Sequence, residues 1–256
     1  MRIKVMTFNI RYDTKGDGIN CFDGRKDMIK EFLDKEMPDI IGFQEVLPHI
    51  RKWLSENLTD YVVLGMGRDA KYSDEGVSIA YRKDKFDLYK FDQFWLSETP
   101  DVPGSRFVLD QSTCPRITVL ATLVSKEDGK VFTFANTHLD HVGKMARACG
   151  ASLLMTRLMN DSKYPFFLTG DFNDFPDSEA IQTIMKVNGV KELTEEIPAD
   201  GVTFHNYGKI TKAHKIDYIF SNEETKLIKN SLKIHTDEKD GIWLSDHYPI
   251  SVTAEI

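Results

Sequence analysis

The chain has 256 residues, of which 41% are hydrophobic, so it is long enough for one large core and short for two independent domains. We therefore expect a single domain over residues 1–256. Asp and Glu number 40 against 33 Lys and Arg, and the net charge of -7 provides no global attraction to polyphosphates. This charge disfavours a long nucleic-acid footprint.

Three cysteines, Cys21, Cys114 and Cys149, lie far apart and form no C-x-x-C pair, which indicates a reducing compartment and no structural zinc. The first residues lead directly into a strand pattern, without the apolar region and cleavage site of a signal peptide. We expect a cytoplasmic protein, unless a signal peptide has been removed. No 18 apolar residues run together, so a membrane span is not expected, and nothing indicates an obligate protein partner.

Strand-like and helix-like segments alternate in the first part of the chain. Val5–Asn9 is compatible with a strand, and apolar residues recur at helical spacing over 28–33 until Pro38 ends the helix. Ile40–Phe43 then predicts a short buried strand that ends at Glu45. A second amphipathic helix is expected over 47–58.

Strands dominate the middle of the chain before helices return. The clearest strand patterns between 61 and 124 are Val77–Tyr81 and Ile117–Leu123, separated by a turn-rich stretch at Ser97–Arg106. The later elements expected are a strand at 131–136, a helix around 148–158, a strand at 166–169, a helix opened by 176–178, and strands at 216–220 and 248–252. This order is typical of an α+β or mixed α/β fold.

Polar residues gather where the apolar strand patterns end. They are Asn9, Glu45, His138, Asp171 and Asn173. Side chains in these positions project from a rigid sheet into the loops of one rim. Asp246 and His247 come just before the last strand pattern, so they reach the same rim if that strand runs antiparallel to the others.

Asp217 is a single carboxylate inside the apolar strand pattern Ile216–Phe220. Because burying an unpaired charge is costly, this carboxylate needs a partner. We expect that partner to be His247.

Six motifs follow one another along nearly the whole chain: Phe8-Asn9, Gln44-Glu45, Asn136-Thr137-His138, Gly170-Asp171-Phe172-Asn173, Ile216-Asp217-Tyr218 and Ser245-Asp246-His247. Together they resemble the endonuclease/exonuclease/phosphatase superfamily, which includes DNase I-like nucleases, abasic-site endonucleases, sphingomyelinases, inositol polyphosphate 5-phosphatases and deadenylases. The resemblance implies a DNase I-like four-layer α/β/β/α sandwich, with two central sheets flanked by helices.

The resemblance also implies a role for each motif residue. Glu45 would be the principal Mg²⁺ ligand, with Asn9 and Asp246 completing the metal site partly through water, and Mn²⁺ is a possible substitute. Asp171 would orient or deprotonate the attacking water, and Asn173 would hold the phosphoryl oxygens. His247, oriented by Asp217, and His138 would donate hydrogen bonds to the phosphate.

Some residues near the motifs are candidates for substrate contact. Arg11 stands where some abasic-site endonucleases carry an Asp, so the resemblance does not extend to a second metal site, and Arg11 is free to contact an anionic group of the substrate. The other candidates, each open between substrate contact and scaffold, are Glu75, Arg116, Asp140, His141, Arg147 and Tyr207.

The sequence therefore favours a Mg²⁺-dependent hydrolase of a phosphomonoester or phosphodiester. One alternative is a nuclease acting on RNA or DNA, which the deadenylase-like stretch Gly170–Ser178 favours and the negative net charge disfavours. Another is a catalytically inactive binding module, which the complete set of motif residues disfavours. The expected substrate is a phosphorylated small molecule or a short nucleic acid.

Overall fold

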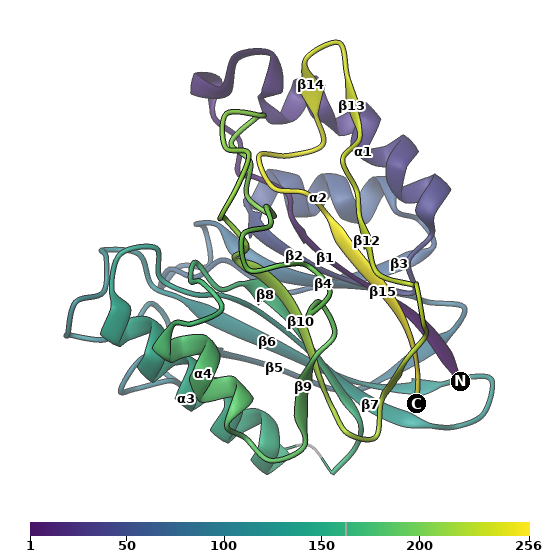
Figure 1. The fold of residues 1–256 in the computed structure, drawn as a ribbon, viewed down its shortest axis with the longest axis vertical. Helices are drawn as coiled ribbons and strands as arrows, with labels where there is room; N and C mark the ends of the chain where they lie inside the picture. The colour runs from purple at the N-terminus through teal and green to yellow at the C-terminus, as the bar shows by residue number, and fades with distance from the viewer. Residues whose placement is uncertain (162) are drawn as a thin grey trace.

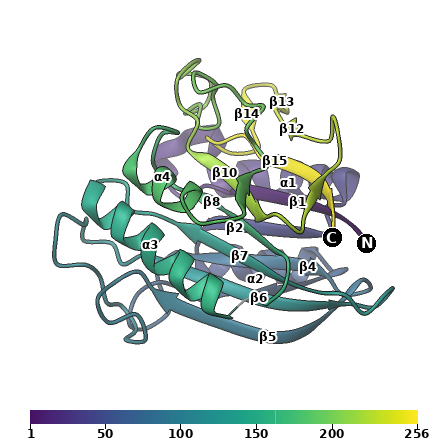
Figure 2. The same ribbon diagram turned by 60° about the horizontal axis from the view of Figure 1, so that its bottom comes forward.

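Two β-sheets pack face to face and carry helices on both outer faces (Figures 1 and 2). The structure is a computed structural model that describes residues 1–161 and 163–256. None of the helices in these residues is long and apolar enough to cross a membrane.

The first sheet brings the two ends of the chain together. Its strands, in spatial order, are β11 (Lys226–Leu227), β15 (Ile250–Glu255), β1 (Arg2–Asn9), β2 (Ile40–Val46), β4 (Gly76–Arg82) and β3 (Tyr61–Leu64), and β12 (Lys233–Ile234) also pairs with β15. β1 runs parallel to β2 and antiparallel to β15. The condition under which Asp246 and His247 reach the same rim, an antiparallel last strand, is thus met.

The second sheet also has one parallel pair, β7 and β8, among antiparallel neighbours. Its order is β5 (Phe86–Trp95), β6 (Ile117–Ser125), β7 (Val131–His138), β8 (Phe166–Asp171), β10 (Asp217–Asn222) and β9 (Val190–Glu192). A separate hairpin joins β13 (Glu238–Lys239) and β14 (Ile242–Trp243).

The helices complete a four-layer sandwich. On the first sheet lie α1 (Phe22–Glu36) and α2 (Pro48–Asn57), and on the second lie α3 (Lys144–Asp161) and α4 (Glu179–Met185); a 3-10 helix, η1 (Lys15–Asn20), precedes α1. One apolar cluster lies between the two sheets, and one lies between each sheet and its helices. The α/β/β/α architecture expected from the sequence is therefore confirmed.

The element boundaries differ from the expected ones for local reasons. α1 begins at Phe22, before the apolar positions that predicted it, and ends where Met37 adopts a left-handed conformation ahead of Pro38. α4 begins at Glu179 because the Ser178 hydroxyl caps the helix by accepting a hydrogen bond from the Ile181 amide.

Asn136 on β7 joins the two sheets at the end where the motif residues gather. Its side-chain nitrogen donates to the carbonyls of Phe43 (2.8 Å) and Ser78 (2.9 Å) in the other sheet. Its oxygen accepts from Gln44 Nε2 (2.7 Å) and Thr169 Oγ1 (3.1 Å). Every polar atom of this buried amide is therefore hydrogen-bonded across or within the sheets.

We expect Asn136→Leu to lower the free energy of unfolding by about 3 kcal/mol or more, because it leaves buried carbonyl and amide groups without partners. Urea denaturation measures this change. Asn160→Leu, at an exposed position of α3, is the matched control and should unfold close to the wild-type denaturant concentration. Equal stability of the two variants would contradict the role given to Asn136.

Candidate active site

The strand ends meet at one rim and surround a cavity of about 620 Å³. The parallel pairs β1–β2 and β7–β8 end there, and the segment before β15 returns to the same place. Lining residues from the expected motifs are Glu45, His138, Asp171, Asn173, Asp246 and His247. Asn9 and Asp217 are buried and do not line the cavity.

Asn9 links the two sheets beneath the cavity. Its side-chain nitrogen donates to Glu45 Oε1 and to Asp171 Oδ2, each at 3.0 Å. Its oxygen accepts from the Arg11 backbone amide at 3.0 Å, which fixes the orientation of the side-chain amide. In this structure Asn9 therefore holds the two carboxylates together, and its oxygen does not face them.

Four non-glycine residues of the cavity have left-handed backbone conformations. Arg11, Glu45, Asn173 and Asn206 have φ values of 60°, 62°, 48° and 47°. Glu45 lies where the register between β2 and β4 shifts, so its backbone is not paired with β4. Its Oε2 accepts a hydrogen bond from the Tyr12 amide at 2.9 Å. Such backbone strain is typical of residues held in place for function.

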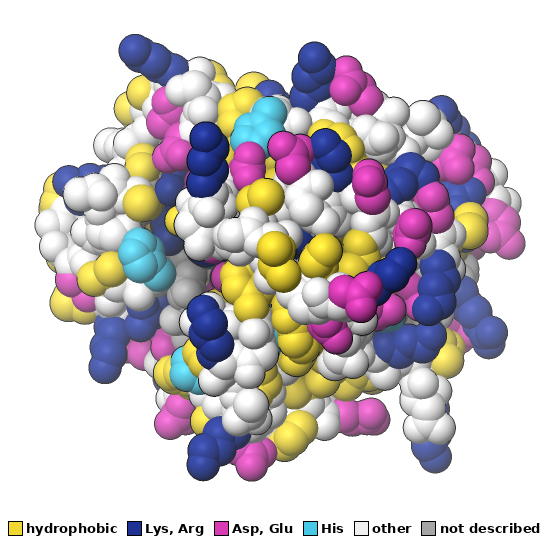
Figure 3. All heavy atoms as spheres, turned by 90° about the horizontal axis from the view of Figure 1, so that it is seen from above, with side chains coloured by type: hydrophobic (Ala, Val, Ile, Leu, Met, Phe, Trp, Pro, Cys, Tyr) yellow, Lys and Arg dark blue, Asp and Glu magenta, His cyan; other side chains and the backbone are white. Residues whose placement is uncertain are grey.

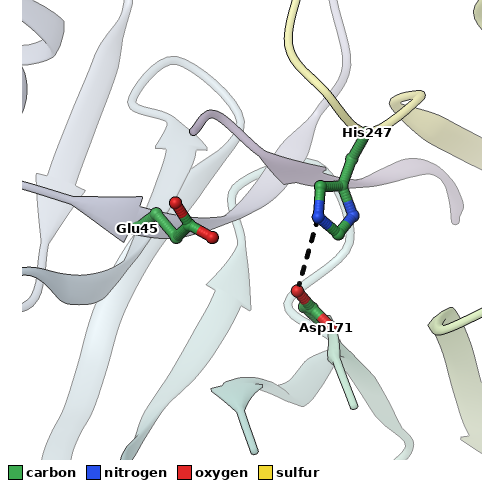
Figure 4. Close-up of side chains that lie close together, drawn as sticks. All are labelled: Glu45, Asp171 and His247. Atoms are coloured by element: carbon green, nitrogen blue, oxygen red, sulfur yellow. Dashed lines mark ion pairs between the residues drawn. The ribbon is translucent and has the colours of Figure 1, made fainter. Parts of the chain in front are cut away.

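His247 and Asp217 form the pair expected from the sequence. His247 Nδ1 lies 2.9 Å from Asp217 Oδ2, and both side chains are buried. The Thr203 hydroxyl fixes Asp217 by accepting hydrogen bonds from the amides of Ile216 and Asp217. On the other side of the ring, Nε2 points toward Asp171 Oδ2 at 3.7 Å (Figure 4).

His138 approaches Asp171 from the opposite side. Its Nε2 lies 3.5 Å from Asp171 Oδ2 and 3.0 Å from Asn173 Nδ2. The Asn173 side-chain nitrogen also donates to the Leu139 carbonyl, so it is the donor and the histidine nitrogen accepts. The backbone amide of Asn173 donates to Asp171 Oδ1 at 2.9 Å.

The two histidines differ in protonation state, because their pKa values shift in opposite directions. Burial lowers the pKa of His247, but the charges of Asp217 and Asp171 outweigh burial and raise this pKa to about 10. For His138, burial and then the charge of Arg116 lower the pKa well below its ordinary value. Burial, and after it the charge of Asp217, raises the pKa of Asp171 to about 7. The site thus has one protonated and one neutral imidazole facing the same carboxylate.

Asp246 and Arg11 form the other wall beside Glu45. Arg11 Nε lies 3.5 Å from Asp246 Oδ2, Arg11 Nη1 lies 3.9 Å from Glu45 Oε2, and Asp17 binds the same guanidinium at 3.0 Å. Burial raises the pKa of the Asp246 carboxyl, the charge of His247 lowers it and the charge of Glu45 raises it, and the net shift is upward. The fully buried Arg25 fixes this wall, because it donates to the carbonyls of Ile10 and Leu244, each at 2.7 Å.

The substrate candidates divide into two groups. Arg11, Glu75, Arg116 and His141 line the cavity. The other three, Asp140, Arg147 and Tyr207, do not line it.

These three side chains have structural partners instead. Asp140 accepts hydrogen bonds from Ser112 and from the amides of Val142 and Gly143. Arg147 pairs with Asp174 at 2.8 Å, and the Tyr207 hydroxyl donates to Asp17 at 2.9 Å.

Several lining residues were missed by the sequence analysis. Arg68, Phe204 and Asn206 lie on the cavity wall, and the Phe204 ring packs at 4.8 Å from the His247 ring. The signals in the sequence are weak: Arg68 follows Gly65 and Gly67, and Asn206 and Tyr207 precede Gly208. Both stretches read as turns, and only the fold brings them to the rim.

Glu45, Asp171 and His247 form a buried cluster in which the two carboxylates could face a metal ion while the protonated imidazole stands beside them. One ligand atom from each lies within 4.8 Å of the others, and all three are buried (Figure 4). Two carboxylates with a third, Asp246, on the same wall are the oxygen-rich set that Mg²⁺ prefers. The donor set therefore fits a hard divalent cation.

The two-sheet sandwich, with buried carboxylates and a charged histidine at one rim, is the arrangement of a class of phosphoester hydrolases. The Endonuclease/Exonuclease/phosphatase family model matches residues 6–247. The chain belongs to this family, whose members are hydrolases acting on phosphoesters.

Solved structures of similar proteins support the same assignment. The chain is similar to an endonuclease/exonuclease/phosphatase from Bacteroides vulgatus, with 34% identity, a TM-score of 0.92 and coverage of 100% of this chain and 99% of that one. It is also similar to a mannosyl-6-phosphatase from Bacteroides thetaiotaomicron, with 28% identity, a TM-score of 0.86 and coverage of 99% and 100%. Human Nocturnin is 23% identical to this chain over 93% of the chain's residues. The chain spans 60% of Nocturnin's length.

The Asp217–His247 pair yields a prediction about pH. If protonated His247 is required, activity falls as pH rises through its raised pKa of about 10. Asp217→Asn removes the largest charge that raises this pKa, so the alkaline limb of the kcat/KM profile should move to lower pH. Asp237→Asn, in the exposed loop before β13, is the control, and its limb should stay in place. If the alkaline limb of the kcat/KM profile does not move in well-folded Asp217→Asn, Asp217 does not set the protonation of a required His247.

Proposed function

We propose that the protein is a Mg²⁺-dependent phosphoesterase that hydrolyses a phosphomonoester or phosphodiester by attack of water on phosphorus. The observation that carries this proposal is the buried cluster of Glu45, Asp171 and His247, whose ligand atoms lie within 4.8 Å of one another. Burying two carboxylates beside a charged histidine costs free energy, and binding a cation to the carboxylates and an anion to the histidine would offset that cost.

Glu45 and Asp246 would hold the Mg²⁺ ion, with water in the remaining positions and Mn²⁺ as a substitute. The ion would neutralise the charge that develops on the phosphoryl oxygens. Asn9 keeps the Glu45 carboxylate in place through its 3.0 Å hydrogen bond. Arg11 contributes a fixed positive charge beside both acids.

Asp171 is suited to act on the water. Its raised pKa of about 7 places it near the range at which a carboxylate accepts a proton at neutral pH. Protonated His247 donates from Nε2 to a phosphoryl oxygen, because Asp217 holds the opposite ring nitrogen. Asn173 Nδ2 donates to His138 Nε2 and to the Leu139 carbonyl, so these two side chains position each other beside Asp171.

A phosphorylated small molecule is the favoured substrate. The net charge is -7, and the face seen in Figure 3 has Lys and Arg side chains interspersed with Asp and Glu. A polymer-binding nuclease needs a continuous basic surface that neutralises several phosphates. The similarity to a mannosyl-6-phosphatase supports a phosphorylated sugar as the first class to test.

Glu45→Gln tests the metal assignment. The change removes one negative charge and keeps the shape of the side chain, so we expect Mg²⁺ affinity measured by calorimetry to fall at least about tenfold, with loss of turnover. The thermal midpoint in EDTA should stay nearly unchanged. Glu56→Gln, at an exposed position on α2, should bind Mg²⁺ like the wild type. Normal Mg²⁺ affinity in Glu45→Gln would remove Glu45 from the metal site.

Salt dependence separates the favoured function from a nuclease. A protein that contacts a polymer through 6–10 phosphates loses about 10³–10⁵ in affinity between 50 mM and 200 mM salt. We expect a shallow dependence of kcat/KM on salt for a phosphorylated sugar, and weak, non-productive binding of poly(A). Steep salt dependence together with efficient cleavage of poly(A) would favour the nuclease.

A further inference from the structure

Arg116 is a buried guanidinium whose hydrogen-bonding capacity is only partly used. The residue is 4% exposed and lines the cavity, and its Nε and Nη1 atoms have no hydrogen-bond partner. Buried arginine donors are normally paired, because leaving them unpaired costs free energy. The unused donors therefore indicate a ligand with acceptor oxygens.

The neighbouring side chains do not satisfy these donors. Asp140 Oδ2 lies 3.6 Å from Arg116 Nε, too far for a hydrogen bond, and this carboxylate already accepts from Ser112 and two backbone amides. Glu75 pairs with Arg68, and burial followed by the charge of Glu45 raises the pKa of Glu75 to about 7. The acids near Arg116 are thus engaged elsewhere.

His141 adds a donor to the same place. Arg116 Nη2 lies 2.8 Å from His141 Nδ1, and because arginine only donates, this ring nitrogen must accept. The proton of the neutral ring is then on Nε2. His141 is exposed and lines the cavity, so its N–H is available to a ligand beside Arg116.

The position of Arg116 places these donors close to the reacting group. Arg116 directly precedes β6, and His138 ends the neighbouring strand β7, so both residues lie at the same end of the sheet and line the cavity. The two side chains also line one narrow recess of the cavity with Arg68. His138 in turn lies 3.5 Å from Asp171. Arg116 thus shares this recess with a histidine that approaches the carboxylate proposed to act on water.

We propose that Arg116 and His141 bind a terminal oxygen of the scissile phosphate and so make the enzyme selective for phosphomonoesters over phosphodiesters. This inference rests on the phosphoesterase function proposed above. A monoester has three terminal oxygens and is mostly a dianion at neutral pH, since its second pKa is about 6. In a diester, one of these oxygens carries a second substituent and one charge is lost, so the oxygen that would accept from the two unused donors of Arg116 is blocked.

Two substrates with the same leaving group test the proposal. They are p-nitrophenyl phosphate and methyl p-nitrophenyl phosphate, which differ by one methyl group on a non-reacting oxygen. We expect Arg116→Met to lower kcat/KM for the monoester by about tenfold to a hundredfold and to leave the methyl diester close to the wild-type value. Arg106→Met, at an exposed position, should change neither. An equal fall for both substrates, or no fall for the monoester, would overturn the proposal.

Stability distinguishes a binding role from a structural one. Because Arg116→Met removes a buried charge with unpaired donors, its Tm should equal or exceed that of the wild type. If the methionine variant fails to fold, Arg116→Lys keeps the charge and loses the planar fork, and it should show a smaller but still selective loss on the monoester. A lysine variant with wild-type selectivity would contradict the role of the guanidinium.

Calorimetry with inorganic phosphate in EDTA separates failure of this inference from failure of the proposed function. If the wild type hydrolyses neither ester with Mg²⁺ or Mn²⁺, the proposed function is wrong. Phosphate binding then still reports on Arg116. Binding that Arg116→Met weakens at least about tenfold supports the anion site, and equal binding by the two proteins refutes it.

Discussion

The contact between the two sheets at the rim is the constraint on which the site depends. The candidate site residues come from both sheets, Glu45 from the first and Asp171 from the second, so the distance between the sheets sets the distance between these two carboxylates. Asn136 fixes that distance with hydrogen bonds to both sheets. Gly42 allows the close approach, since a Cβ atom there would lie 2.2 Å from Thr169 Oγ1 and 2.6 Å from Asn136 Oδ1.

Once the sheets are held, electrostatics differentiates chemically identical side chains. His138 and His247 both contact Asp171, yet one is neutral and the other protonated. The difference comes from their neighbours: a carboxylate, Asp217, lies behind His247, whereas a guanidinium, Arg116, lies near His138. Environments that push the pKa values of paired groups apart are how one site supplies both donors and acceptors at the same pH.

Much of the fold and part of the site could be predicted from the sequence. Apolar strand patterns ending in Asn9, Glu45 and Asp171 predicted a common rim, because strand ends are readable from local periodicity. The Asp217–His247 pair followed from the cost of burying a lone carboxylate.

The rest depends on contacts between distant segments, which local patterns do not encode. Arg147 and Tyr207 turn to Asp174 and Asp17 because the fold brings those acids beside them. Arg68 reaches the cavity from a turn-like stretch with no apolar periodicity. The left-handed backbone of Glu45 arises from a register shift between β2 and β4, which a strand pattern does not reveal.

The pairing of β1 with β15 joins the first strand of the chain to the last one. Asn9 ends β1, and Asp246 and His247 precede β15, so these residues meet only when the two ends of the chain pair. Contacts of such long sequence separation form late and slowly in folding. His247 and Asp246 therefore have no local precursor of the site, and a chain whose ends are unpaired lacks the complete set of side chains around the cavity.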